Sequence, residues 1–191
     1  MDAPAPQTTL GISIRLAQLD DAERIAQTQV AGWRNAYRGI LDDATLQNLP
    51  LEEWTATWRG RLSSPRASGA LCLVADDTRR GVVGFTHGGP SRPLANGLAA
   101  TPFDAELYAI YLAEDLIGRG VGTRLTHALA GELVAHGWQA LIVWALAENP
   151  FRRFYERLGG MRAYEQEITV YGQPLREVGY GWHDLRTLSA R

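Results

Sequence analysis

Three glycines alternate within residues 116–125, at Gly118, Gly120 and Gly122. The stretch follows an apolar run and precedes a segment in which apolar residues recur at helical spacing. A glycine-rich turn between a strand and a helix can direct free backbone N–H groups, together with the positive end of the helix dipole, toward one anion. Phosphate is the usual ligand of such turns, so the sequence predicts a phosphate-binding loop at this helix start.

Two familiar versions of such a loop fit the sequence poorly. The dinucleotide fingerprint G-x-G-x-x-G needs its third glycine at position 123, where this chain has Thr123. The nucleoside triphosphate loop needs a lysine, and all 19 basic residues of the chain are arginines. The lack of lysine also excludes a lysine Schiff base. A dinucleotide-dependent oxidoreductase is therefore a disfavoured alternative.

Cysteine and histidine offer little further chemistry. The single cysteine, Cys72, lies in an apolar run and is interpreted as a core residue rather than a nucleophile. His127, His136 and His183 do not group with acidic residues at the spacing of metal ligands. We therefore expect no metal site.

The overall charge and the lack of long apolar runs favour a soluble protein that acts on small molecules. A formal net charge of −2 gives no broad electrostatic surface for nucleic acid or for an anionic membrane. Residues 1–11 lack the features of a signal peptide, and no apolar run reaches the roughly 20 residues that span a bilayer. We expect a cytoplasmic location.

Alternating and helical patterns predict the elements that must position the glycine loop. Helices are expected over residues 20–37, 41–49, 51–62, 123–137 and 149–160. Strands are expected over residues 12–18, 70–76, 81–89, 105–113 and 140–146, followed by a closing hairpin over residues 167–182. This order predicts one domain with a mixed sheet flanked by helices.

The glycine loop and its surroundings resemble the GCN5-related N-acetyltransferases, whose signature Q/R-x-x-G-x-G/A lies between the fourth strand and the third helix. Ile117 stands at the first position of that signature, where it departs from the family, and Gly120 and Gly122 match both glycines. Residues 105–133 and 141–163 are similar to the family's central blocks.

The resemblance implies an α+β fold with a mixed, mostly antiparallel sheet of about seven strands, flanked by helices. It extends over residues 12–185, which we expect to form a single acetyltransferase domain. Residues 1–11 are expected to be a flexible tail, and residues 186–191 a C-terminal tail. The exposed edge of a mixed sheet favours a homodimer.

The resemblance also implies acetyl-CoA as a cosubstrate, with its pyrophosphate held by the backbone amides of the glycine loop. Amides of the fourth strand would face the acetyl group where the fourth and fifth strands separate. Asn149 matches a cofactor-contacting asparagine of the family, and it is also a good helix N-cap. The expected cofactor-binding residues are Ile110, Leu112, Gly118, Arg119, Gly120, Val121, Gly122, Thr123, Asn149 and Tyr155.

Two residues are candidates for acid and base chemistry. Tyr155 matches the family's tyrosine that protonates the leaving thiolate, and a hydroxyl with a pKa near 10 can do so at neutral pH. Its alternative role is that of a packed aromatic beside Phe151 and Phe154. Glu106 matches a glutamate that many family members use as a base, and burial would raise its pKa. Its alternative role is that of a solvated strand-end charge.

The acceptor is expected to be a primary amine, carried by a small molecule or a peptide. Candidate residues for binding it are Trp33, Tyr37 and His87. Glu148, His87 and Tyr111 are the alternatives to Glu106 as the base. Helix packing is the alternative role for the tryptophan. The predicted function is N-acetyl transfer by direct attack in a ternary complex. A non-catalytic CoA-binding regulatory module, or a transferase that uses another acyl-CoA, remains an alternative.

Overall fold

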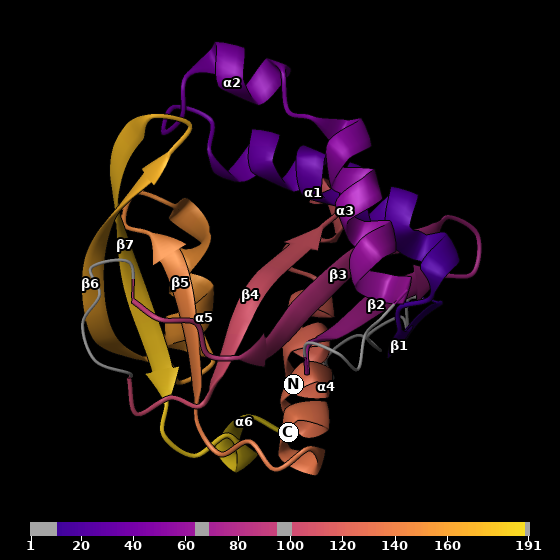
Figure 1. Cartoon of the computed structure of the whole chain (residues 1–191). Coiled ribbons are helices and arrows are strands. Elements are labelled where there is room, and N and C mark those ends of the chain that lie inside the picture. Colours follow the sequence, from indigo (N-terminus) through magenta and orange to yellow (C-terminus); the bar gives the residue numbers. More distant parts are fainter. Residues whose placement is uncertain (1–10, 64–68, 95–100, 190–191) are drawn as a thin grey trace, which may run out of the picture.

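The computed structural model describes residues 11–63, 69–94 and 101–189. Seven strands form one sheet in the order β1-β2-β3-β4-β5-β7-β6 (Figure 1). Every neighbouring pair is antiparallel except β4 and β5, which run parallel. The strands are β1 (Ile12–Leu16), β2 (Leu71–Asp77), β3 (Gly81–Pro90), β4 (Ala105–Leu112), β5 (Leu141–Leu146), β6 (Met161–Val170) and β7 (Gln173–Trp182).

Helices cover both faces of the sheet (Figure 1). One face carries α1 (Ala22–Ala36) and α3 (Leu51–Ser63), with α2 (Asp43–Gln47) between them in the chain. The other face carries α4 (Val121–Ala135), α5 (Arg153–Arg157) and α6 (Arg186–Ser189). Three short 3-10 helices, η1 (Leu19–Asp21), η2 (Glu114–Leu116) and η3 (Pro150–Arg152), complete the described elements.

Two hydrophobic clusters hold these layers to the sheet. The larger lies under α4, where Leu125, Leu129 and Leu133 follow helical spacing and are fully buried, with α4 packed against β2, β3 and β4. The smaller lies under α1 and α3, where Trp58 packs edge-to-face on Phe85 at 5.1 Å between ring centroids. The central strands are thus covered on both faces, which makes β4 and β5 firm supports for a site.

The centre of the sheet opens where β4 and β5 part. Their parallel pairing covers only Ala105–Leu107 against Leu141–Val143, although β4 continues to Leu112. The register between β3 and β4 also shifts after His87, so Tyr108 is an extra residue in β4. Such a bulge bends the strand and exchanges the faces of the residues beyond it. The bulge therefore lies where β4 turns away from β5.

The structure confirms the predicted fold, although the closing hairpin begins at Met161 rather than at residue 167, and the C-terminus also differs. The prediction ended the domain at residue 185, but the chain continues into α6, and Leu188 is 2% exposed within the larger cluster. A four-residue helix carries too little periodicity to be recognised in a sequence. The predicted N-terminal tail falls on residues of which only Gly11 is described. None of the described helices is both long and apolar enough to cross a membrane.

Candidate functional site

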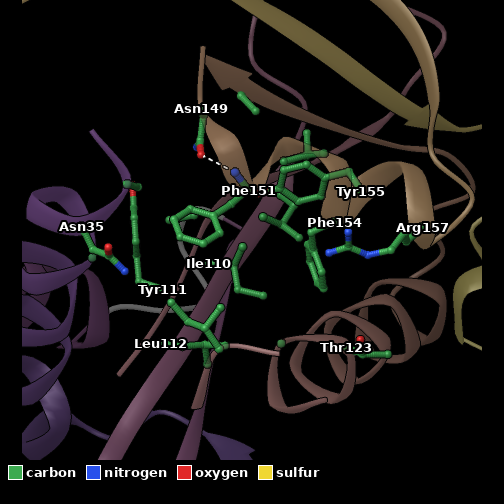
Figure 2. Close-up of a pocket in the computed structure, with 18 of the residues that line it drawn as sticks. Asn35, Ile110, Tyr111, Leu112, Thr123, Asn149, Phe151, Phe154, Tyr155 and Arg157 are labelled. Atoms are coloured by element: carbon green, nitrogen blue, oxygen red, sulfur yellow. Dashed lines mark hydrogen bonds between the residues drawn. The ribbon is translucent and has the colours of Figure 1, made fainter. Parts of the chain in front are cut away.

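A cavity of about 560 Å³ occupies the opening between β4 and β5. Figure 2 shows Ile110 and Leu112 of β4 on one side, Phe154 and Tyr155 of α5 on the other, and Thr123 of α4 beside them. The lining residues come from α1, β4, the glycine loop, β5 and α5: Gly32, Asn35, Ala36, Tyr37, Leu107, Tyr108, Ala109, Ile110, Tyr111, Leu112, Ile117, Gly118, Gly120, Gly122, Thr123, Val143, Trp144, Ala145, Asn149, Phe151, Phe154, Tyr155 and Arg157.

The glycine loop presents bare backbone to this cavity. Gly118 and Gly120 both have φ of +79°, in the left-handed region that glycine adopts without strain. A Cβ at either position would meet no atom within 4 Å, so the chain itself does not crowd the loop. Gly120 is the N-cap of α4, and the first amides of a helix have no acceptor within the helix. These amides can therefore hold an anion at the mouth of the cavity.

Gly122 has a different purpose from the other two glycines. A Cβ at this position would lie 3.3 Å from Leu112 Cδ1 and 3.5 Å from Phe154 Cζ. The missing side chain lets α4 approach β4 and α5 closely, and this approach brings the helix N-terminus to the cavity.

Two amides of β4 point into the opening. Ala113 N–H donates to Val83 O across the β3–β4 pair at 2.8 Å. Because backbone groups alternate along a strand, the N–H groups of Leu112 and Ile110 point to the opposite edge, toward β5. The β4–β5 pairing has already ended at Leu107, so these groups face the cavity rather than a neighbouring strand.

Tyr155 projects from α5 toward β4 (Figure 2). Its ring packs against Phe154 at 5.3 Å and against Tyr180 at 6.0 Å between centroids. Burial raises the pKa of its hydroxyl, and the nearby Tyr37 acts in the same direction. The hydroxyl is therefore protonated at neutral pH, as a proton donor must be.

Asn149 is the N-cap that the sequence predicted. Its Oδ1 accepts a hydrogen bond from Phe151 N–H at 2.9 Å, and Pro150 begins the 3-10 helix (Figure 2). The cap sets the direction in which η3 and α5 leave β5, and it thereby orients Tyr155. Asn149 also lines the cavity, so one residue can serve both purposes.

A tyrosine pair closes the cavity on the side of α1. The hydroxyls of Tyr37 and Tyr111 lie 3.2 Å apart, and burial raises the pKa of both. Tyr111 lies over Gly32, where a Cβ would come within 2.3 Å of Tyr111 Cδ1. Gly32 thus sits in the middle of a helix, at a cost of about 1 kcal/mol relative to alanine, to make room for this ring.

Glu106 is buried but strongly engaged. It is 1% exposed, and Arg92 donates to its carboxylate from the backbone N–H at 3.0 Å, from Nε at 3.0 Å and from Nη2. The Arg92 guanidinium also lies 4.9 Å from the ring centroid of Tyr108. Glu106 does not line the cavity. Its charge is balanced within the protein, so a solvated strand-end charge does not describe it.

His87 is a core imidazole. It packs between Trp58 and Tyr108, with ring centroids at 5.1 and 5.0 Å. Burial lowers its pKa to about 4, and the charges of Arg61 and Arg92 act in the same direction. His87 is therefore neutral at pH 7, and it does not line the cavity.

Trp33 belongs to an aromatic cluster beside the cavity. Its ring makes edge-to-face contacts with Tyr37 at 5.0 Å, Trp54 at 5.2 Å and Tyr171 at 6.1 Å. Tyr171 lies at the tip of the β6–β7 hairpin, so Trp33 links this tip to α1. The cluster forms one wall of the approach to Tyr37.

The structure brings most of the predicted residues together. Arg119 and Val121 are the exceptions among the expected cofactor-binding residues: the Arg119 side chain is exposed, and Val121 is buried in the core. The sequence reasoning missed Asn35, Trp144 and Arg157 as lining residues. It also missed Gly32, although a glycine inside an amphipathic helix is a recognisable signal of close approach. Among the described residues, no group of three or more histidine, cysteine, aspartate or glutamate side chains is placed to hold a metal ion.

Comparison with known proteins places the chain in a family. Residues 82–170 match the model of the FR47-like proteins. The chain is also 34% identical over 177 residues to YuaI, an uncharacterized N-acetyltransferase of Bacillus subtilis strain 168, and the match covers 93% of this chain and 96% of YuaI. The chain belongs to the GCN5-related N-acetyltransferase family. As a member of this family it is an N-acetyltransferase, and the predicted resemblance is confirmed.

Solved structures agree with the family fold. The PaiA N-acetyltransferase of Thermoplasma acidophilum, in complex with coenzyme A, superposes with a TM-score of 0.65 at 15% identity, over 87% of this chain and 97% of that protein. YncA, a putative acetyltransferase of Salmonella typhimurium with acetyl-CoA, superposes with a TM-score of 0.64 at 17% identity, over 90% and 93%. At these identities the likeness establishes the fold.

Proposed function

We propose that the protein transfers the acetyl group of acetyl-CoA to a primary amine, by direct attack of the amine while both substrates are bound. The observation that carries the proposal is the cavity between β4 and β5, which joins the bare amides of the glycine loop to Tyr155. Membership of the N-acetyltransferase family supports it. Two structurally similar proteins were solved with coenzyme A or acetyl-CoA, which supports this choice of cosubstrate.

The glycine loop is the proposed pyrophosphate site. Free amides at the start of α4 and the helix dipole both favour a doubly charged anion. Gly118, Gly120 and Thr123 line the cavity at this end. The Ile110 and Leu112 amides would hold the pantetheine arm and the carbonyl oxygen of the acetyl group, where negative charge develops during attack. Acetyl-CoA supplies the thioester that the amine attacks.

Tyr155 is the proposed acid. The leaving thiolate needs a proton, and the Tyr155 hydroxyl stays protonated because burial raises its pKa. Tyr155 comes from α5, across the cavity from Ile110 and Leu112 of β4 (Figure 2). An acid at this point would meet the sulfur when the amides hold the carbonyl.

A carboxylate is the proposed base, because an ammonium group must lose a proton before it can attack. Glu106 is the candidate from the sequence. Because Glu106 is ion-paired with Arg92, it could act as a base only if it released Arg92 and bound the acceptor amine instead. The acceptor would approach past Tyr37 and Trp144, which line the cavity on the side of α1 and β5.

Thiol release tests the proposal. The purified protein would be mixed with acetyl-CoA and, in turn, with spermidine, tyramine, lysine and an alanyl peptide, and free CoA would be measured by its thiol. We expect turnover that depends on one class of amine. Turnover with a longer acyl-CoA but not with acetyl-CoA would show that the donor is that acyl-CoA. Tight acetyl-CoA binding without turnover on any amine or longer acyl-CoA would favour a non-catalytic CoA-binding module.

A further inference from the structure

A half-buried carboxylate, Glu177, lies on β7. Along this strand Val178, Tyr180 and Trp182 point into the cluster under α4. Side chains alternate between the faces of a strand, so Gln173, Glu177 and Gly179 point to the opposite face, toward α1 and α2. Glu177 therefore lies on the α1–α2 face of the sheet, outside the residues that line the cavity.

Contacts between the tip of the β6–β7 hairpin and the α1–α2 segment agree with this orientation of the odd-numbered β7 side chains. At the end of β7, Gln173 Nε2 donates to Asp42 Oδ2, at the N-cap of α2, at 3.1 Å. The adjoining Tyr171 ring lies 6.1 Å from the Trp33 ring of α1. The hairpin tip thus reaches over to the α1–α2 segment (Figure 1). Glu177 lies four residues after Gln173, on the same face of β7.

Two residues that line the cavity, Trp144 and Tyr37, are neighbours of Glu177. It pairs with Leu146 of β5, so Trp144, which lines the cavity, is its diagonal neighbour on the same face. The carboxylate is also close enough to the Tyr37 hydroxyl to raise its pKa. Tyr37 and Trp144 both line the proposed path of the acceptor, and Glu177 lies beside both.

Glu177 is hydrogen-bonded by a neutral side chain rather than by an arginine. Gln166 Nε2 of β6 donates to Glu177 Oε1 at 2.5 Å, and this donor is neutral. Among the residues that the structure describes, no arginine forms an ion pair with Glu177, whereas Glu106 is held by Arg92. Burial raises the pKa of Glu177; Gln166 and the charge of Arg92 oppose the shift, and Glu106 adds to it. A half-buried anion of this kind attracts a cation.

We propose that Glu177 binds the ammonium group of the acceptor and takes its proton. This inference rests on the proposed acetyl transfer and specifies the acceptor as a cationic amine that enters between α1 and the β6–β7 hairpin. Glu106, paired with Arg92, then positions β4 and the segment after β3. The Trp33 and Tyr37 rings would contact the carbon skeleton of the acceptor, next to its charge.

The protons balance in this scheme. The ammonium group gives one proton to Glu177, and the neutral nitrogen forms its bond to the acetyl carbon while the carbon–sulfur bond breaks. Tyr155 protonates the thiolate. The second proton lost by the nitrogen restores the Tyr155 hydroxyl, and the proton on Glu177 returns to solvent. The sum is one amide, one thiol and one released proton.

The test compares Glu177→Gln with Glu106→Gln and with Glu167→Gln, an exposed glutamate on the neighbouring strand β6. For the amine that turns over, kcat/KM would be measured from pH 6 to about pH 10 at saturating acetyl-CoA. Glu177→Gln should lower kcat/KM about a hundredfold at neutral pH. The deficit should narrow as the pH approaches the pKa of the amine, near 10, because a free amine needs no base. Acetyl-CoA affinity and melting temperature should stay near those of the wild type.

Three outcomes separate the possibilities. A wild-type profile in Glu177→Gln, with wild-type acetyl-CoA binding, overturns the inference and leaves acetyl transfer standing. If the loss of kcat/KM shrinks with rising pH in Glu106→Gln but not in Glu177→Gln, then Glu106 is the base. This result also overturns the inference about Glu177. If Glu177→Gln melts early, Glu177→Asp keeps the charge and should retain more activity at neutral pH than Glu177→Gln; equal losses would contradict the proposal. A wild-type protein that neither binds nor uses acetyl-CoA removes the proposed function itself.

Discussion

The two halves of the cavity are lined by different chemical groups, backbone amides in one and side chains in the other. The half formed by the glycine loop, the end of β4 and the start of α4 offers backbone amides and small residues, with Gly118 and Gly120 in conformations that side chains disfavour. The half formed by α1 and β5 offers aromatic rings, such as Tyr37 and Trp144, and the Glu177 carboxylate of β7 lies next to Trp144. Backbone groups can recognise one constant donor, whereas side chains can be exchanged to suit different acceptors. Under the proposed function, the first half holds the donor and the second sets the choice of acceptor.

The largest effect is expected at the boundary between the halves, at Tyr155. Tyr155→Phe removes the proposed acid and keeps the ring, so kcat should fall about a hundredfold while acetyl-CoA affinity stays nearly constant. Steady-state kinetics and calorimetric titration measure the two quantities. Tyr164→Phe, which removes a tyrosine hydroxyl from β6 outside the cavity lining, is the matched control. An unchanged kcat in Tyr155→Phe would remove this residue from the mechanism.

A substitution in the glycine loop should weaken the donor half alone. Gly120→Ala places a Cβ at φ of +79°, which costs about 1–2 kcal/mol, and sets it in the open space before the loop. Acetyl-CoA affinity should fall about tenfold, a change that calorimetry can follow. Gly131→Ala changes the same helix at a position with no neighbour within 4 Å, and should keep wild-type affinity and at least wild-type stability. Equal affinities in the two variants would contradict an amide cradle.

A substitution under Tyr111 should disturb the acceptor half. Gly32→Ala places a Cβ 2.3 Å from Tyr111 Cδ1, so the ring must move, and we expect this to disturb the Tyr37–Tyr111 hydrogen bond. Overpacking of this kind costs about 1–3 kcal/mol of stability. KM for the amine should rise several-fold, with a smaller change in acetyl-CoA affinity. Gly60→Ala on α3, where a Cβ has open space, is the control; a wild-type KM in Gly32→Ala would show that the tyrosine pair does not shape the acceptor site.

The smallest effect is a pH dependence of stability on the acceptor face. His87 has a pKa of about 4 in the folded protein, below the value near 6.5 expected for the unfolded chain. Between these values the unfolded state binds the extra proton, so stability should fall as the pH drops from about 6.5 to about 4. Urea unfolding at several pH values would measure this slope. His87→Phe should make the slope shallower, and an identical slope would assign the acid sensitivity to other groups.

The sequence predicted the donor half better than the acceptor half, for physical reasons. Glycines at a strand–helix junction and an asparagine before Pro150 have few structural explanations, so the loop and the N-cap could be recognised from their order alone. The partner of Glu106 could not be recognised, because Arg92 reaches it from a loop whose path depends on the whole sheet. Glu177 was missed because it lies 71 positions after Glu106 and reaches the same face only through the strand order β4-β5-β7.

The central claim is that the cavity between β4 and β5 receives acetyl-CoA. Calorimetric titration of the wild-type protein with acetyl-CoA, with NAD and ATP as controls, tests it most directly. We expect one molecule of acetyl-CoA to bind per chain, and neither control to compete. An absence of binding, or equal binding of all three ligands, would mean that the glycine loop is only a turn and that this chain keeps the family's fold without its donor site.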